Sequence, residues 1–269
     1  MIYFDLASDL HTDLWRDNIN SIDFSNPLSS TLVIAGDTSN YVSELLEIVK
    51  NSKKYYENVI IIDGNHEHYF SLKNPYMLES YLAREITSLN GNYLCGKSVI
   101  KINKTAFIGA NGWYDFKINE ENFTIQENIK NWNNFSNDSR MILWQGSSPT
   151  FIATDHFKLL SNQVNDLQND NSVDNIVIIT HTAPHKKLLP YKGDYSWDCL
   201  TSAYGNSMME NIIKIDKKHK IKVWVYGHSH SKLDKTINNI RYVNNARGYE
   251  SEKHILGKWS FVQIKSDGT

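Results

Sequence analysis

Six short apolar segments, each of a length typical of a buried β-strand, are spread at long intervals along this sequence of 269 residues. They are rich in Ile, Val, Leu and Phe, as buried strands usually are. The segments are Ile2–Ala7, Leu32–Ala35, Val59–Ile62, Ala106–Ile108, Ile176–Ile179 and Val223–Tyr226. Helical patterns lie between several of them, and strands that alternate with helices form layered domains. The sequence therefore predicts an α/β fold.

The helical patterns are visible in the spacing of apolar residues. They recur at three and four positions in Val42–Val49, and Asp155–Leu167 and Met208–Ile215 show a similar pattern. Near the end of the chain, Ile240–Val243 and Trp259–Val262 predict two strands with no helix between them. We expect these two strands to form an antiparallel finish to the fold.

Length and composition favour one domain over 1–269, with elaborated loops at 117–140 and 186–198. The balance of 28 Lys and Arg against 30 Asp and Glu gives no broad basic field, so nucleic acid is not an expected partner. No apolar run approaches the ~20 residues of a membrane span, and the N-terminus lacks the features of a signal peptide. Cys95 and Cys199 are far apart in sequence, which favours reduced thiols and a cytoplasmic location.

Polar side chains follow five of the six predicted strands at the point where each strand ends. The blocks are Asp9-Leu10-His11, Gly36-Asp37, Asp63-Gly64-Asn65-His66-Glu67, Thr180-His181 and Gly227-His228-Ser229-His230. In open α/β sheets, the carboxyl ends of the strands form the edge at which ligands bind. We therefore expect these side chains to build a site at that edge.

Carboxylate, imidazole and amide groups together suit Mn, Fe, Zn or Ni, and the absence of ligand cysteines argues against a Cys-type structural zinc site. Seven candidate ligands exceed the need of one tetrahedral ion and fit two ions that share a carboxylate. A histidine considered alone more often satisfies a structural hydrogen bond than binds metal, so the ordered set carries the prediction. Other histidines lack this context: we interpret His156, His219 and His254 as structural or surface residues, and His68 and His185 at most as pocket lining.

The order of these blocks resembles the calcineurin-like metallophosphoesterase superfamily, over nearly the whole chain. Flanking segments are similar to a group of small bacterial phosphoesterases: Trp113-Tyr114-Asp115-Phe116, Ala203-Tyr204 and Asn245-Ala246-Arg247-Gly248-Tyr249. In that group the last segment usually has Pro at the position of Ala246, a difference with a local effect. The resemblance implies a four-layer αββα sandwich with a dinuclear metal site at the C-terminal ends of the strands.

The resemblance also assigns roles to residues. It implies one metal held by Asp9, His11 and His230, another held by Asn65, His181 and His228, and Asp37 bridging both. His66 matches a catalytic histidine that faces the leaving group or a phosphate oxygen. The cofactors would be two divalent ions, with Mn expected and Fe, Zn or Ni as alternatives. Two such ions and two carboxylates leave a net charge of +2. This charge suits a bridging hydroxide, formed from a water whose pKa the metals lower toward ~7.

The implied activity is that of a metal-dependent phosphoric ester hydrolase, a phosphatase or phosphodiesterase. Its substrate would be a small phosphomonoester or phosphodiester, such as a nucleotide or cyclic nucleotide, hydrolysed through the metal-bridging hydroxide. Protein Ser/Thr phosphatases of the superfamily have Val-Asp-Arg-Gly after Gly-Asp, whereas this chain has Thr38-Ser39-Asn40-Tyr41. The phosphate-gripping Arg is therefore missing, which argues against that class. The group that orients His66 is left open.

Several alternatives remain. Trp113, Tyr114, Phe116 and Tyr191 are candidates for stacking on a base or for core packing, and Arg247 for a phosphate contact or a structural role. A catalytically silent scaffold or binding protein is the alternative to an enzyme, although such proteins typically lose ligands and every position here is filled. A single-metal hydrolase of an unrelated fold is a third possibility. The choice between monoester and diester, the natural substrate and the oligomeric state are left open.

Overall fold

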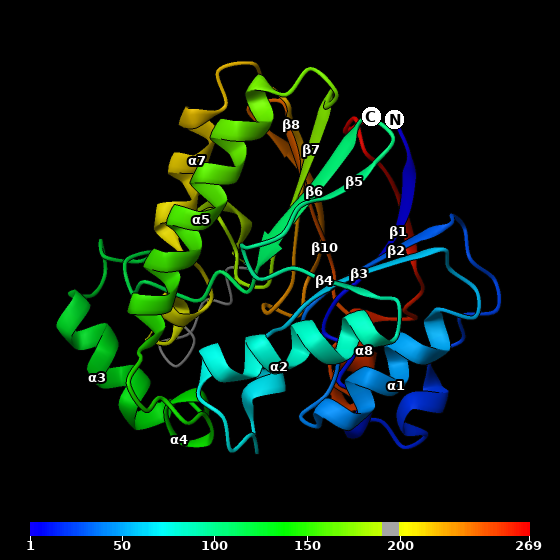
Figure 1. Ribbon diagram of the computed structural model, residues 1–269. Helices are drawn as coiled ribbons and strands as arrows, with labels where there is room; N and C mark the ends of the chain where they lie inside the picture. The colour runs from blue at the N-terminus through cyan, green and yellow to red at the C-terminus, as the bar shows by residue number, and fades with distance from the viewer. Residues whose placement is uncertain (190–198) are drawn as a thin grey trace.

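The computed structural model describes residues 1–189 and 199–269, which form two facing β-sheets with helices on their outer sides (Figure 1). The first sheet, in the order β11-β1-β2-β3-β4, contains β1 (Tyr3–Ala7), β2 (Thr31–Ala35), β3 (Asn58–Ile62), β4 (Asn92–Tyr93) and β11 (Val262–Lys265). The second, in the order β5-β6-β7-β8-β10-β9, contains β5 (Ile100–Ile102), β6 (Thr105–Ala110), β7 (Asn175–Thr180), β8 (Ile221–Tyr226), β9 (Lys232–Ile237) and β10 (Ile240–Asn245).

Most neighbouring strands run parallel, and this brings the predicted polar blocks to one edge of the molecule. Strands β1 to β4 are parallel, as are β6, β7, β8 and β10, while β11, β5 and β9 are antiparallel at the outer positions. A parallel bridge between Ser8 and Ala246 links the two sheets beyond the ends of β1 and β10. The carboxyl ends of strands from both sheets therefore lie close together.

The space between the sheets is filled by apolar side chains from both of their inner faces. The first sheet contributes residues such as Phe4, Ile60 and Ile62, and the second contributes residues such as Phe107 and Val225, all without exposed surface. The rings of Phe4 and Phe107 meet edge to face across this layer, with centroids 5.5 Å apart. Burial on this scale is the main favourable term for holding the two sheets together.

Helices cover the outer faces, and they complete four layers in the order α, β, β, α (Figure 1). On the first sheet lie α1 (Val42–Ser52) and α2 (Pro75–Ser88), and on the second lie α5 (Pro149–Asn169) and α7 (Glu210–Ile215). In α1 the buried residues Leu45, Ile48 and Val49 share one face. The predicted four-layer αββα sandwich is confirmed. No helix of the described residues is both long and apolar enough to span a bilayer.

The segment 117–140, expected as a loop, contains two helices: α3 (Ile125–Phe135) and α4 (Asp138–Met141). Thr124 begins α3 with a capping box, because its side chain accepts from the backbone of Glu127 while the Glu127 carboxylate accepts from the backbone of Thr124. The other expected loop, 186–198, is described only as far as residue 189, including a 3₁₀ turn at Lys186–Leu188. Residues 190–198, and with them Tyr191, lie outside the described residues.

For three aromatic residues the structure favours one of the two alternatives left open, and for the last strands it contradicts the prediction. The aromatic side chains of Trp113, Tyr114 and Phe116 are at most 3% exposed and pack in a cluster with Trp132, so they are core residues and not a platform for a base. The predicted pair of final strands is separated by a short helix, α8 (Lys253–Leu256). The second of these strands begins only at Val262 and pairs with β1, while β10 pairs antiparallel with β9.

Truncation of Phe4 tests the layer between the sheets. We expect Phe4→Ala to lower the free energy of unfolding by about 3–5 kcal/mol, because it removes buried contacts with Phe107 and leaves a cavity. Urea denaturation followed by circular dichroism measures the change. Phe151→Ala, at a side chain that is 57% exposed on α5, is the matched control and should change stability by no more than about 0.5 kcal/mol. Equal effects of the two substitutions would contradict this account of the core.

Candidate metal centre

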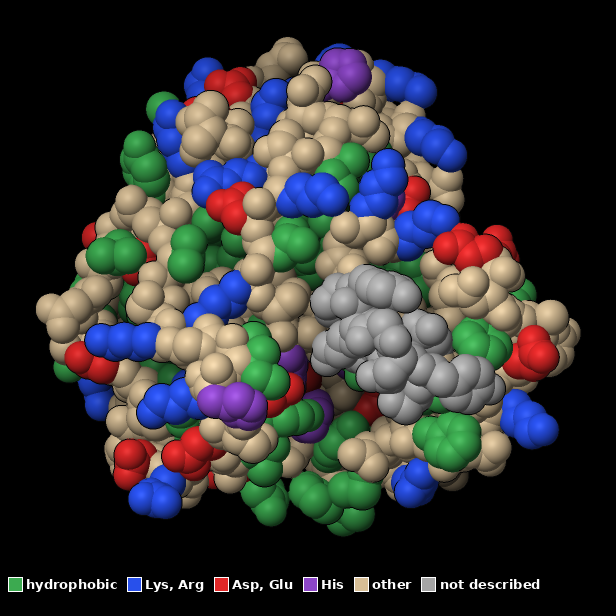
Figure 2. Space-filling model, turned by 180° about the vertical axis from the view of Figure 1, so that it is seen from behind, with side chains coloured by type: hydrophobic (Ala, Val, Ile, Leu, Met, Phe, Trp, Pro, Cys, Tyr) green, Lys and Arg blue, Asp and Glu red, His purple; other side chains and the backbone are tan. Residues whose placement is uncertain are grey.

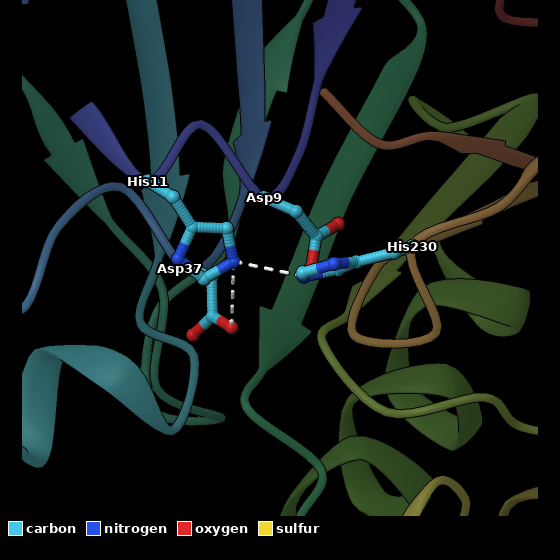
Figure 3. A group of neighbouring side chains, drawn as sticks. All are labelled: Asp9, His11, Asp37 and His230. Carbon is cyan, nitrogen blue, oxygen red and sulfur yellow. Dashed lines mark hydrogen bonds and ion pairs between the residues drawn. The ribbon is translucent and has the colours of Figure 1, made fainter. Parts of the chain in front are cut away.

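Four of the predicted ligands converge where β1, β2 and β8 end (Figure 3). Asp9 and His11 follow β1, Asp37 follows β2, and His230 follows β8. His11 Nε2 lies 2.9 Å from His230 Nε2 and 3.6 Å from Asp37 Oδ2. Asp9 Oδ1 lies 3.7 Å from His230 Nε2. These four side chains form one group whose ligand atoms are close enough to hold a single metal ion.

A second group is formed by Asp37, His181 and His228, which follow β2, β7 and β8. Asp37 Oδ2 lies 3.2 Å from His181 Nε2. The side chain of Asn65 belongs to the same place, because its Oδ1 lies 3.1 Å from His181 Nε2. Asp37 is common to both groups, so the seven predicted ligands lie together as two adjoining clusters that share one carboxylate.

The backbone is unusual at most of these positions. Asp9, His11, Asp37, His228 and His230 all have φ between 42° and 67°, in the left-handed region that side chains other than Gly rarely adopt. Such a conformation costs free energy and persists only where the surrounding structure enforces it, typically at functional sites. The turns that follow the strands thus direct several candidate ligand side chains into one small volume.

Hydrogen bonds on the far side of three imidazoles fix their orientation. His181 Nδ1 donates to the carbonyl oxygen of Ala35 at 2.9 Å, and His228 Nε2 donates to the carbonyl oxygen of Ala203 at 3.0 Å. His230 Nδ1 donates to the carboxylate of Glu252 at 2.6 Å. We assign these tautomers from the acceptors. In each ring the second nitrogen then carries the lone pair toward the cluster, as in metal-ligating histidines.

Two further observations fit divalent cations in this place. Asp9 Oδ2 is buried and has no hydrogen-bond partner, so a carboxylate oxygen is left unsatisfied within the cluster. Two nitrogens that bind one ion at about 2.0–2.1 Å and at a right angle lie about 3 Å apart. The separation of 2.9 Å between His11 Nε2 and His230 Nε2 matches that value. The oxygen and nitrogen donors are those that Mn, Fe, Zn and Ni bind.

Burial and the charges of neighbouring groups strongly shift the pKa values of side chains in the cluster. Burial alone would raise the pKa of Asp37, but the imidazoles of His181, His66 and His11 outweigh it, and the pKa lies well below its usual range. For His181, burial lowers the pKa, but the carboxylates of Asp37 and Asp9 raise it to about 10. The pKa of His228 falls to about 4 because of burial and the neighbouring His181. Carboxylate charge at the centre thus attracts cations, whether protons or metal ions.

His66 lies beside the clusters, and the structure identifies the residue that orients it, which the sequence alone did not. Its Nδ1 donates to Asn40 Oδ1 at 2.7 Å, and Asn40 Nδ2 donates in turn to the carboxylate of Asp13 at 2.7 Å. His66 Nε2 faces the site, 3.3 Å from the hydroxyl of Tyr249 and 4.0 Å from Asp37 Oδ2. Asn40 is therefore the group that sets the position of this ring.

Glu67 joins two of the turns that carry candidate ligands. Its buried carboxylate accepts hydrogen bonds from the backbone nitrogens of Gly64, Asp37 and Thr38 at 2.6, 3.1 and 2.5 Å. Burial and the charge of Asp37 raise the pKa of Glu67 to about 7 in spite of these bonds. At Gly64 no larger residue fits, because a Cβ there would overlap the Asp37 carboxylate. Glu67 thereby fixes Asp37 relative to the segment that carries Asn65 and His66.

A cavity of about 240 Å³ opens beside the clusters. Figure 2 shows histidine side chains at the bottom of a hollow on this face of the molecule. The lining includes Asp37, Asn65, His66, His228 and His230, together with residues to which the sequence analysis gave no role in the site. These additional residues are Tyr69, Asp138, Tyr249 and Glu252. Glu252 and Asp138 lie in polar segments without any pattern, so no signal in the sequence marks them.

The remaining predicted candidates lie elsewhere or have structural contacts. His68 Nε2 pairs with Asp63 at 2.7 Å and His156 Nε2 with Glu79 at 3.0 Å, and both pairs are buried. His185 is not among the cavity-lining residues, and His219 and His254 are exposed. Arg247 stacks on Trp15 at 3.6 Å and donates to the Leu10 carbonyl, so it has a structural role.

Comparisons with known proteins agree with this architecture. A family model described as calcineurin-like phosphoesterase matches residues 2–232. An uncharacterized protein of Acanthamoeba polyphaga mimivirus is 24% identical over 94% of this chain and 95% of its own length. Among solved structures, the phosphopantetheinyl hydrolase of Mycobacterium tuberculosis has a TM-score of 0.79 at 15% identity, covering 97% of this chain and 95% of its own. A dimetal phosphatase of Danio rerio has a TM-score of 0.55 at 13% identity, covering 97% and 91%. The match of the family model over most of the chain shows that this protein belongs to the calcineurin-like phosphoesterase family.

Proposed function

We propose that this protein is a metal-dependent phosphoesterase that hydrolyses a small phosphomonoester or phosphodiester, such as a nucleotide or cyclic nucleotide. The observation that carries the proposal is the pair of adjoining clusters that share Asp37 and open into a cavity. Every predicted ligand position is filled, which argues against a silent scaffold. The cavity volume of about 240 Å³ suits a small ester.

The proposed ligand roles follow the two clusters. Asp9, His11 and His230 would hold one ion, and Asn65, His181 and His228 the other. Asp37 would bridge the two ions. We propose manganese as the metal, since the mixture of carboxylate, amide and imidazole ligands suits it. We also propose a cytoplasmic location, because a fold of this size does not need disulfides.

The chemistry that two such ions supply when bound is activation of a water for attack and neutralisation of phosphoryl charge. The protein's own part is to position the ester and to manage a proton. His66 is placed to hold a proton on Nε2, which faces the cavity, while Nδ1 is fixed by Asn40. Asp13 keeps the Asn40 amide in the orientation that presents its oxygen to His66. Proton transfer from Nε2 to the leaving oxygen would then need no rearrangement of the ring.

Removal of metal is the first test. We expect a chelator to abolish hydrolysis of p-nitrophenyl phosphate and bis-p-nitrophenyl phosphate, and added Mn²⁺ to restore it. The metal-free protein should stay folded by circular dichroism, because the ligands sit at strand ends of a large core. Full activity in a sample that metal analysis shows to be metal-free would refute the mechanism. Metal binding without hydrolysis of any phosphate ester would favour the scaffold.

Asp37 should matter more for metal loading than His11. We expect Asp37→Asn to lose both ions and His11→Ala to lose mainly one, because the bridging carboxylate offsets the repulsion between the ions. Elemental analysis of each purified variant gives the number of ions per chain. Two ions held by Asp37→Asn with wild-type affinity would show that the bridge is assigned to the wrong residue.

His66→Ala should keep both ions and lower the rate by about 10²–10⁴-fold, the usual effect of losing a general acid. The rate of hydrolysis should fall most for an alkyl ester and least for a nitrophenyl ester, since nitrophenolate leaves readily without a proton. Rates for substrates of graded leaving-group pKa measure this. A uniform loss would mean that His66 neutralises phosphate oxygens instead, and loss of metal would make it a ligand.

A further inference from the structure

Asp138 is a buried carboxylate that lines the cavity and has no place in the ligand set or in the proton path. It begins α4, in the segment 117–140, and is 4% exposed. Its Oδ1 accepts from Asn65 Nδ2 at 2.9 Å. Asn65 Oδ1 points to the other side, toward His181. One amide group therefore separates the Asp138 carboxylate from the second cluster.

The contacts of Asp138 are those of an ionised group. Besides the Asn65 amide, the hydroxyls of Tyr69 and Tyr114 donate to it at 2.6 and 2.9 Å. Trp132 Nε1 donates to the Tyr114 oxygen at 2.6 Å, which leaves the Tyr114 hydroxyl hydrogen available for Asp138. Burial, and then Asp138 itself, raise the pKa of both tyrosines well above the usual range, so they remain donors. In all of these contacts the Asp138 side chain acts as an acceptor, which is the role of a carboxylate.

Because of the charge balance of the cavity, the Asp138 carboxylate affects which substrate charge the site can accept. The described lining residues include the acids Asp37, Asp138 and Glu252, but neither Lys nor Arg. Two divalent ions would bring four positive charges, and Asp9, Asp37, Asp138 and Glu252 together bring four negative ones. Such a site gains little from a second negative charge on the substrate, and in a poorly solvated cavity charge repulsion is strong.

We propose that Asp138 makes this site selective for phosphodiesters, which carry one negative charge, over phosphomonoesters, which carry two. The proposal rests on the proposed phosphoesterase function and names the substrate class within it. Asp138 would act through its charge, and also through the orientation of Asn65. The two effects can be separated, since poor orientation of Asn65 would slow both ester classes alike.

The wild-type protein provides the first measurement. Bis-p-nitrophenyl phosphate and p-nitrophenyl phosphate share a leaving group and differ in charge at about pH 8, well above the second pKa of a phosphate monoester. With two Mn²⁺ per chain, we expect a higher kcat/KM for the diester. A preference for the monoester would overturn the proposal, whether or not any variant folds.

Asp138→Asn provides the second measurement, because it removes the charge and keeps the shape and an oxygen acceptor. We expect the ratio of diester to monoester kcat/KM to fall at least about tenfold, as for an interaction worth one pKa unit. The matched control is Asp115→Asn. Asp115 is equally buried in the same region, accepts from Ser207 Oγ at 2.6 Å and does not line the cavity. A ratio unchanged in Asp138→Asn, or changed equally in the control, would refute charge selection.

Binding gives a readout that does not depend on turnover. Calorimetry on protein with verified metal content gives the affinity for inorganic phosphate and for dimethyl phosphate. We expect the ratio of these two affinities, phosphate over dimethyl phosphate, to be about tenfold lower in the wild-type protein than in Asp138→Asn. The same relative affinity in both proteins would overturn the proposal. If metal-loaded wild-type protein hydrolyses neither ester, the proposed function fails, while this binding comparison still decides whether Asp138 selects by charge.

Discussion

One oxygen atom, Asp37 Oδ2, lies within 4.0 Å of imidazole nitrogens from His11, His66 and His181. Those side chains follow three different strands drawn from both sheets. A buried carboxylate is stable only where hydrogen bonds or positive charges compensate it, and around Asp37 the neighbouring imidazoles can do so. The arrangement therefore requires that the two sheets be held in a fixed relation. The apolar layer between them supplies that rigidity. Within the first sheet, the hydrogen bonds of Glu67 hold the turns after β2 and β3 together.

The α/β class and the set of converging residues were predictable because both depend on local patterns, whereas the four-layer arrangement was implied by the resemblance to the family. A buried parallel strand needs a continuous apolar run, and its end is marked by the first polar residues, such as Asp9 after β1 or His181 after β7. Parallel pairing then brings those ends together without further information. The helix α2 escaped prediction, although Asn74 caps it, Pro75 occupies its first position, and Leu78, Leu82 and Ile86 form its buried face. These are standard signals of a helix, so α2 could have been predicted from the sequence.

The supporting residues could not be predicted, since they come from distant parts of the chain. Asp138 is 73 positions from its partner Asn65, and Glu252 is 22 positions from His230. Neither stands next to an apolar strand. Asn40 is nearer to the recognisable blocks, but only the folded turn shows that its amide meets His66. For Trp113 and Tyr114 the sequence left core packing and base stacking open, and only the packing of α3 and α4 over them shows that they belong to the core.

The chain of hydrogen bonds from Trp132 through Tyr114 to Asp138 has an optical consequence. Indole emission responds to nearby charge and to hydrogen bonding at its nitrogen. The ring of Trp132 lies 5.8 Å from that of Trp144, which in turn lies 5.0 Å from that of Trp113. Excitation energy passes readily between indoles at such separations. Intrinsic fluorescence is therefore a built-in reporter of events in the cavity, and a ligand that perturbs Asp138 should be visible without any label.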